Sequence, residues 1–134
     1  TVKDIGSDEL IDKLDTLALD KYCEEKKVFF TKSDIFVQPT FEDCFPLTIL
    51  EAMQYKLPIV STDEGAVPDM VKNETNGFVC KRMDAGSTAD AIARLLDSKE
   101  LRTQLGENGY RLFKEHFTLD VFNKGITEIL KEQI

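Results

Sequence analysis

The sequence is poor in the residue types on which several classes of protein depend. Its 134 residues include one histidine, His116, and three cysteines, Cys23, Cys44 and Cys80, which form no C-x-x-C pair. One histidine cannot build a metal cluster alone, and an odd number of scattered cysteines argues against a disulfide framework and against a structural zinc. The sequence therefore predicts no metal site, and it predicts reduced thiols of the kind found in cytoplasmic proteins.

Long apolar runs and an excess of basic residues are absent as well. No apolar run approaches the ~18 residues that a membrane-spanning helix needs, so we expect no integral membrane segment. The first ten residues, TVKDIGSDEL, lack the basic and apolar regions of a signal peptide. With 17 basic against 25 acidic residues and a net charge of −8, the surface repels phosphates, so no nucleic acid is expected as a partner. Any phosphate site must then depend on backbone N–H groups.

What is present is an alternation of short apolar runs with stretches of helical spacing. Length and β-branched or aromatic content predict buried strands over residues 34–38, 58–62 and 78–80. Apolar residues recur at helical spacing in residues 7–19, 46–57, 88–97, 99–105, 109–116 and those after Thr118. This order predicts an α/β fold: a Rossmann-like parallel sheet with flanking helices and extra C-terminal helices. Three strands are few for a doubly wound domain, which suggests part of a larger fold.

The ends of the expected helices follow from particular residues. Pro46 is expected at the first helical position, where its missing N–H costs nothing. Ser87 and Thr88 are the expected caps of the helix that follows the third strand. Gly106 and Asn108-Gly109 are expected to interrupt the helical stretch in which they lie.

One helix carries an isolated acid. From Cys44 to Tyr55 the only charged residue is Glu51, and apolar side chains surround it on nearly every side of the helix. A helix that is apolar all round is buried, and a lone carboxylate there is costly unless it is paired or lines a cleft. Both interpretations stay open: a buried Glu51 satisfied by a backbone amide or a lysine, or a functional Glu51 in a cleft.

Two loops that follow strands offer places for a ligand. In parallel α/β sheets, ligands bind beyond the carboxyl ends of the strands, where a helix start presents N–H groups to an anion. Residues 44–47 occupy such a start, where Phe45 keeps its N–H, and the loop 63–66 follows the next strand with Gly65. Side by side, the two loops would cradle a diphosphate. Asp43 precedes the helix, and its carboxylate would either accept hydrogen bonds from sugar hydroxyls or cap the helix.

These residues resemble a known family. The run Asp43-Cys-Phe-Pro-Leu-Thr-Ile-Leu-Glu51-Ala-Met53 is similar to its signature, in which two acids are separated by seven residues, with F-[GP]-L between them and E-A-M at the second. LPIVSTDEG, PD and NGF follow at the expected spacings. The chain resembles the C-terminal domain of retaining glycosyltransferases of family 4, which have the GT-B architecture of two Rossmann-like domains facing a cleft. The resemblance implies that residues 1–134 are a single donor-binding domain, without its first strands and without the N-terminal acceptor domain.

The resemblance also implies roles for individual residues. Glu51 would hold the ribose hydroxyls of a nucleotide-diphosphate sugar and Asp43 would contact the donor sugar, so these two are the implied catalytic acids. The other implied donor-binding positions are Cys44, Phe45, Pro46, Leu47, Gly65 and Ala66. The implied reaction transfers a glycosyl group to an acceptor hydroxyl with retention, and it needs no cofactor and no essential metal.

The sequence departs from the family pattern at several points. Asp43 is one methylene shorter than the usual Glu, and Gly65-Ala66 replaces Gly-Gly. Cys23-Glu-Glu25 replaces the strand and glycine loop expected near residues 22–26, and the basic residues that usually neutralise the diphosphate are missing. We therefore expect a donor-binding half that has little or no transferase activity alone.

Partners and setting follow from the same resemblance. The donor would be a nucleotide-diphosphate sugar, and the missing N-terminal domain or a second copy of the chain would complete the fold. Bacterial relatives suggest polysaccharide or lipopolysaccharide synthesis in the cytoplasm, with the full-length enzyme peripheral at the inner membrane. The alternatives are a nucleotide-sugar-binding module without chemistry, a structural fragment that binds nothing, and, less well matched by the signature, a nucleotide-sugar 2-epimerase.

Overall fold

The computed structural model describes residues 23–132 of the chain, which divides into two compact units, Thr1–Lys32 and Ser33–Ile134. In the first unit residues 23–32 are helical, and the helix expected over residues 7–19 lies outside the described residues. The expectation of a single domain stays a prediction. Within the described part, no helix combines the length and the apolar character of a membrane span.

The second unit contains a parallel sheet of three strands: β1 (Phe36–Gln38), β2 (Ile59–Thr62) and β3 (Gly77–Cys80). They lie side by side in sequence order, and Val60 of the central strand faces Phe78 across the β2–β3 ladder. Every residue of β2 is buried, as its apolar run predicts. The three predicted strands are confirmed, with bounds that differ by at most two residues.

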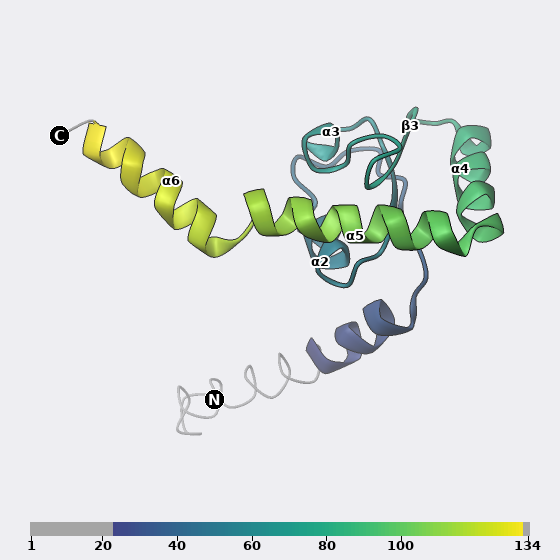
Figure 1. Cartoon of the computed structure of the whole chain (residues 1–134). Coiled ribbons are helices and arrows are strands. Elements are labelled where there is room, and N and C mark those ends of the chain that lie inside the picture. Colours follow the sequence, from purple (N-terminus) through teal and green to yellow (C-terminus); the bar gives the residue numbers. More distant parts are fainter. Residues whose placement is uncertain (1–22, 133–134) are drawn as a thin grey trace, which may run out of the picture. The chain divides into compact units, whose positions relative to one another are not determined.

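Five helices belong to the described part of this unit (Figure 1). They are α2 (Leu47–Gln54), α3 (Val67–Met70), α4 (Ala85–Asp97), α5 (Lys99–His116) and α6 (Leu119–Glu132). Helices α2 and α3 connect successive strands, because parallel strands need a crossover between them. The other three follow β3, so the predicted α/β fold with additional C-terminal helices is confirmed.

The core lies where α4 and the start of α5 pack on the sheet. Its buried members come from β2, β3 and the two helices: Val60, Phe78, Cys80, Ala91, Leu95 and Leu105. Helix α2 adds three side chains without exposed area, Ile49, Ala52 and Met53. Removal of this apolar surface from water, at roughly 25 cal/mol per Å², is the main force that holds the helices on the sheet.

Helix α2 differs from its prediction at both ends. Pro46 is the N-cap with an extended ψ of 100°, so Leu47 and not Pro46 is the first helical residue. The helix ends at Gln54, because Lys56 takes a positive φ of 58° in the turn that leads into β2. Leu47 is 65% exposed while Ile49 is buried, so the expectation of a helix buried on every side is wrong for its first turn, which lies outside the core.

Helix α4 begins three residues before the predicted position, because a different residue caps it. Asp84 is the N-cap, and its Oδ1 accepts a hydrogen bond from the Ser87 N–H at 3.0 Å. Aspartate caps helices as well as serine does, so Asp84, which comes earlier in the chain, caps α4. Ser87 and Thr88 are therefore inside the helix, and both hydroxyls donate to the Asp84 carbonyl.

Helix α5 runs without the interruption that its glycines predict. Gly106 and Gly109 are both buried inside it. A Cβ at Gly106 would lie 2.0 Å from the Lys56 carbonyl oxygen, so glycine is the residue that lets α5 approach the end of α2. The glycine marks helix packing here and not a helix end.

Helix α6 confirms the expected cap, since the Val121 N–H donates to Thr118 Oγ1 at 3.3 Å. None of its residues is buried, although its apolar residues recur at helical spacing. Its exposed apolar side chains are Leu119, Val121, Phe122, Ile126, Ile129 and Leu130.

Candidate functional site

The carboxyl ends of β1 and β2 are joined by side-chain hydrogen bonds. Ser61 Oγ donates to the Gln38 carbonyl at 2.7 Å, and Thr62 Oγ1 donates to the Thr40 carbonyl at 2.5 Å. Thr48, in the first turn of α2, donates through Oγ1 to Gln38 Oε1 at 2.7 Å. The start of α2 is therefore fixed to the end of the strand that precedes it.

The first turn of α2 presents backbone donors at this end of the sheet. The N–H groups of Leu47 and Thr48 open the helix, so they have no carbonyl partner within it, and the helix dipole adds a partial positive charge. Pro46 contributes no N–H. The Phe45 N–H, which is predicted to face a ligand, instead donates to Asp43 Oδ1 at 3.1 Å.

Asp43 is thus a half-buried acid that closes a tight turn directly before α2. Asp43 does not cap α2, because the Phe45 N–H precedes the N-cap Pro46 and no side chain caps this helix. The Asp43 carboxylate lies next to the start of α2.

Glu51 lies in the second turn of α2, one turn beyond Leu47. Its side chain is neither fully buried nor fully exposed, and one carboxylate oxygen, Oε2, is shielded from solvent. Ala52 and Met53 beside it point into the core. Glu51 therefore stands at the boundary between the core and the surface.

The loop 63–66 lies directly against the turn that precedes α2. Gly65 has a φ of 51°, and a Cβ there would lie 2.0 Å from the Asp43 carbonyl oxygen and 2.9 Å from that of Cys44. The Ala66 N–H donates to the Cys44 carbonyl at 3.0 Å. The two loops are side by side, and Gly65 is required by their contact, whereas the sequence analysis explained it by the approach of a ligand.

Arg82 is a residue at this end that the sequence analysis missed. Its guanidinium forms an ion pair with Glu64, with 2.6 Å between Nη1 and Oε2, and it lies 6.0 Å from the centre of the Phe41 ring. Its backbone N–H donates to Asp63 Oδ1 at 3.1 Å. The signal in the sequence is its position two residues after the third strand, at the end of the sheet where the two candidate ligand loops are expected.

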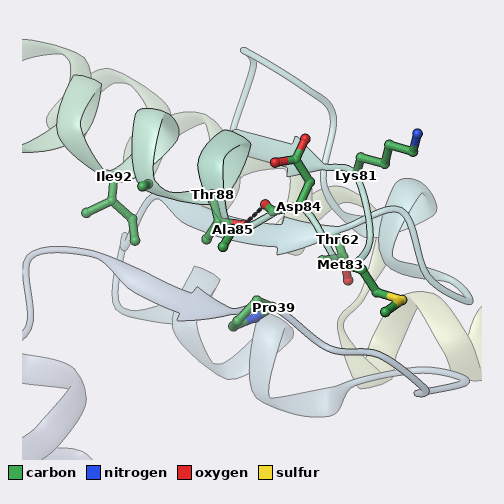
Figure 2. Close-up of a pocket in the computed structure, with 9 residues that line it drawn as sticks. Pro39, Thr62, Lys81, Met83, Asp84, Ala85, Thr88 and Ile92 are labelled. Atoms are coloured by element: carbon green, nitrogen blue, oxygen red, sulfur yellow. Dashed lines mark hydrogen bonds between the residues drawn. The ribbon is translucent and has the colours of Figure 1, made fainter.

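A separate pocket of about 410 Å³ opens at the same end of the sheet, beside the start of α4 (Figure 2). Figure 2 shows Pro39, Thr62 and Met83 bordering it from the strand ends, with Thr88 and Ile92 of α4 opposite. Its lining is mainly apolar. None of the predicted donor-binding residues lines it.

The chemistry of the described residues offers no ready metal site. Within residues 23–132 no group of three His, Cys, Asp or Glu side chains is arranged to hold a metal ion. The three cysteines are free thiols, with Cys44 exposed and Cys80 buried. N–H groups at the start of a helix are suited to binding an anion, and carboxylates beside them can accept hydrogen bonds from hydroxyl groups of the same ligand.

The family of the chain follows from its amino-acid sequence. Residues 9–112 match the family of glycosyl transferases group 1. The chain belongs to this family. It is 38% identical over 77 residues to sucrose-phosphate synthase of Spinacia oleracea, and 26% identical over 105 residues to the capsular polysaccharide biosynthesis glycosyltransferase CapM of Staphylococcus aureus. These alignments cover 58% and 78% of this chain but only 7% and 28% of the two relatives.

Solved structures show that the chain has the fold of part of a GT-B glycosyltransferase. Sucrose-phosphate synthase from Thermosynechococcus elongatus superposes with a TM-score of 0.74 at 24% identity, over 79% of this chain and 27% of its own. Anabaena HepE, solved in complex with UDP, superposes with a TM-score of 0.73 at 21% identity, over 78% of this chain and 29% of its own. The chain therefore corresponds to less than a third of either enzyme.

Proposed function

We propose that this chain is the donor-binding part of a retaining glycosyltransferase of family 4, in which it would bind a nucleotide-diphosphate sugar. The observation that supports the proposal is the arrangement at the start of α2. There, Asp43 precedes the helix, Glu51 follows one turn inside it, and the loop 63–66 lies against the turn that opens the helix. A relative of the same fold, HepE, was solved with UDP and with UDP-glucose.

Each group has a role in this proposal. Glu51 would accept hydrogen bonds from the two ribose hydroxyls, since a carboxylate accepts a vicinal diol well. The N–H groups at the start of α2 would face the diphosphate, and Asp43 would meet the donor sugar. The residues that line the donor would be Cys44, Phe45, Pro46, Leu47, Gly65 and Ala66.

The proposed reaction needs neither a cofactor nor an essential metal. Departure of the nucleotide diphosphate places negative charge on phosphate oxygens, and fixed N–H dipoles at a helix start stabilise such charge. The acceptor would bind across a cleft, on an N-terminal domain or on a second copy of the chain. Alone, the chain would have little or no transferase activity, because one wall of the cleft would be missing.

The setting is proposed from the relatives. CapM is by its name an enzyme of capsular polysaccharide biosynthesis. We place the parent enzyme of this chain in bacterial polysaccharide or lipopolysaccharide synthesis, in the cytoplasm and peripheral at the inner membrane.

A second candidate is a nucleotide-sugar-binding module without chemistry. The observation that favours it is the hydrogen bond from the Phe45 N–H to Asp43 Oδ1, which engages the shorter of the two acids in a turn. Addition of a separately expressed N-terminal domain from a relative distinguishes the two candidates. Donor-dependent transfer supports the enzyme, and donor binding without any transfer supports the module.

The proposed function is tested by titrating the chain with UDP, UDP-glucose and GDP-mannose in a calorimeter. We expect at least one of them to bind, and we expect Glu51→Gln to weaken its binding roughly tenfold or more, since a hydrogen bond to a charged group contributes ~1.5–3 kcal/mol. Glu128→Gln, an exposed glutamate of α6, is the matched control and should change nothing. Equal affinity of Glu51→Gln and the unmodified chain would contradict the assignment of Glu51.

A further inference from the structure

Arg82 connects the loops that follow all three strands. Its guanidinium pairs with Glu64 in the loop after β2 and lies over Phe41 in the loop after β1. Arg82 itself follows β3, and its N–H donates to Asp63 Oδ1. The Asp63 N–H in turn donates to the Cys80 carbonyl at 3.0 Å. One residue thus contacts each loop at the carboxyl ends of the sheet.

These contacts reach the start of α2 through a short path. Glu64 is followed by Gly65, whose backbone lies against the Asp43 carbonyl, and by Ala66, whose N–H donates to the Cys44 carbonyl. Asp43 then holds the Phe45 N–H. The loop 63–66 therefore lies between Arg82 and the turn that opens α2.

The ion pair between Arg82 and Glu64 also changes the net charge near the start of α2. The loops after the three strands carry Glu42, Asp43, Asp63, Glu64 and Asp84 against Lys81 and Arg82. An anionic ligand at the start of α2 meets a surplus of carboxylates there, and a like charge close by is unfavourable. Pairing with Arg82 neutralises the Glu64 carboxylate, which lies next to Gly65.

We propose that Arg82 is a positioning residue for the donor: it holds Glu64, and through it the loop 63–66, against the turn that opens α2. The inference rests on the proposed function. Arg82 acts here through Glu64 and not by contact with the ligand.

The solvent exposure of the Arg82–Glu64 ion pair indicates which measurable property its loss should change. The side chains of Arg82 and Glu64 are 49% and 21% exposed, and ion pairs that reach solvent contribute little to folding stability. Loss of the pair should therefore change ligand affinity while the melting temperature changes little.

The test is a double-mutant cycle in the chain of residues 1–134, with UDP as the probe and calorimetry as the readout. Arg82→Ala and Glu64→Ala should each weaken UDP binding, by roughly threefold to tenfold, and the double variant should be no weaker than either single variant, as for two members of one interaction. The charge-swapped variant, Arg82→Glu with Glu64→Arg, should restore most of the affinity.

Arg94 is the matched control, because it makes the same two kinds of contact elsewhere. Its Nη1 lies 2.9 Å from Glu74 Oε1, and its guanidinium lies 4.5 Å from the centre of the Phe78 ring. Arg94→Ala should leave UDP affinity unchanged whatever it does to the melting temperature.

Four outcomes would overturn the inference. Normal UDP affinity of Arg82→Ala would remove the role of Arg82 while leaving that of Glu51 intact. A weakened Arg82→Ala with a normal Glu64→Ala, or a charge swap that restores nothing, would show that Arg82 acts through its charge and not by holding Glu64 and the loop 63–66. Absence of UDP binding by the unmodified chain, with binding of another nucleotide sugar also absent, would overturn the proposed function and this inference together.

Discussion

At each end of the sheet a glycine packs closely against a backbone carbonyl, but the two contacts join different parts of the molecule. At the amino ends, Gly106 of α5 lies against the Lys56 carbonyl, just before β2. At the carboxyl ends, Gly65 lies against the Asp43 carbonyl, just before α2. In both places a Cβ would come within 2.0 Å of a backbone oxygen. The first contact joins α5 to the turn between α2 and β2, whereas the second joins two surface loops, and only the second lies where parallel sheets bind ligands.

The surroundings of the two glycines differ in the same way. Near the amino ends, Asn76 is completely buried, with Nδ2 donating to the Met70 carbonyl at 3.1 Å and Oδ1 accepting from the Lys72 N–H at 2.7 Å. Near the carboxyl ends, Phe41 and Met83 are large apolar side chains left mostly exposed. Interior polar groups that are fully bonded stabilise a fold, whereas Met83 borders the pocket beside the start of α4. The difference suggests that stability and binding can be altered separately.

Among the substitutions that test this comparison, Gly106→Ala should lower the free energy of unfolding the most. The added methyl group meets a backbone oxygen that cannot move away without shifting α5 from the end of α2. We expect the free energy of unfolding to fall by about 3 kcal/mol, as for severe overpacking of a core. Urea denaturation followed by circular dichroism measures it.

Gly125→Ala is the control for the helix itself. Gly125 lies inside α6, and apart from its chain neighbours and the helix's own backbone no atom lies within 4 Å of the position that an added methyl group would take. Alanine therefore adds only helix propensity there and should stabilise by ~0.5–1 kcal/mol. If Gly106→Ala were as stable as Gly125→Ala, the close approach of α5 to Lys56 would be wrong.

Gly65→Ala tests the other end. Its φ of 51° is unfavourable for alanine, and the methyl group meets the Asp43 carbonyl, so the free energy of unfolding should fall by about 2 kcal/mol. Because the strain falls on the loops and not on the core, we also expect the folded variant to lose UDP affinity, which Gly106→Ala should retain. Calorimetry at a temperature where both variants are folded measures this.

Gly86→Ala serves as the control at the same end of the sheet. Gly86 lies in the first turn of α4, and its nearest neighbour is a carboxylate oxygen of Asp84 at 3.3 Å. UDP affinity that fell equally in Gly86→Ala and Gly65→Ala would show that the contact between the two loops has no special role.

The sequence predicts the strands well and the glycines poorly, for one physical reason. A buried strand is recognised from its own residues, as β2 is from Ile59–Thr62. A glycine in a helix is compatible with a break or with close packing, and what decides for Gly106 is Lys56, which lies far earlier in the chain. Local sequence therefore predicts α5 in pieces, whereas the folded helix is continuous.

The residues of the candidate site also differ in how well the sequence predicts them. Asp43 and Glu51 are visible in the sequence, because their spacing is local: Asp43 lies just before α2 and Glu51 lies inside it. Arg82 is not, because its partners Glu64 and Phe41 come from other loops and meet it only in the folded chain. The cap of α4 was missed for a smaller reason: Asp84, Ser87 and Thr88 are all good caps, and sequence alone does not rank them.

The smallest expected effect concerns the caps at the two ends of α4. Asp84 caps α4 at the carboxyl ends of the sheet, and Ser98, after α4, caps α5 by accepting the Leu101 N–H at 3.1 Å. Asp84→Ala and Ser98→Ala should each lower the free energy of unfolding by about 1 kcal/mol, whereas Asp84→Asn keeps the cap and should cost only a few tenths. Urea denaturation measures all three. A loss in Asp84→Asn equal to that in Asp84→Ala would mean that the charge of Asp84, and not its hydrogen bond to Ser87, stabilises this end of the helix.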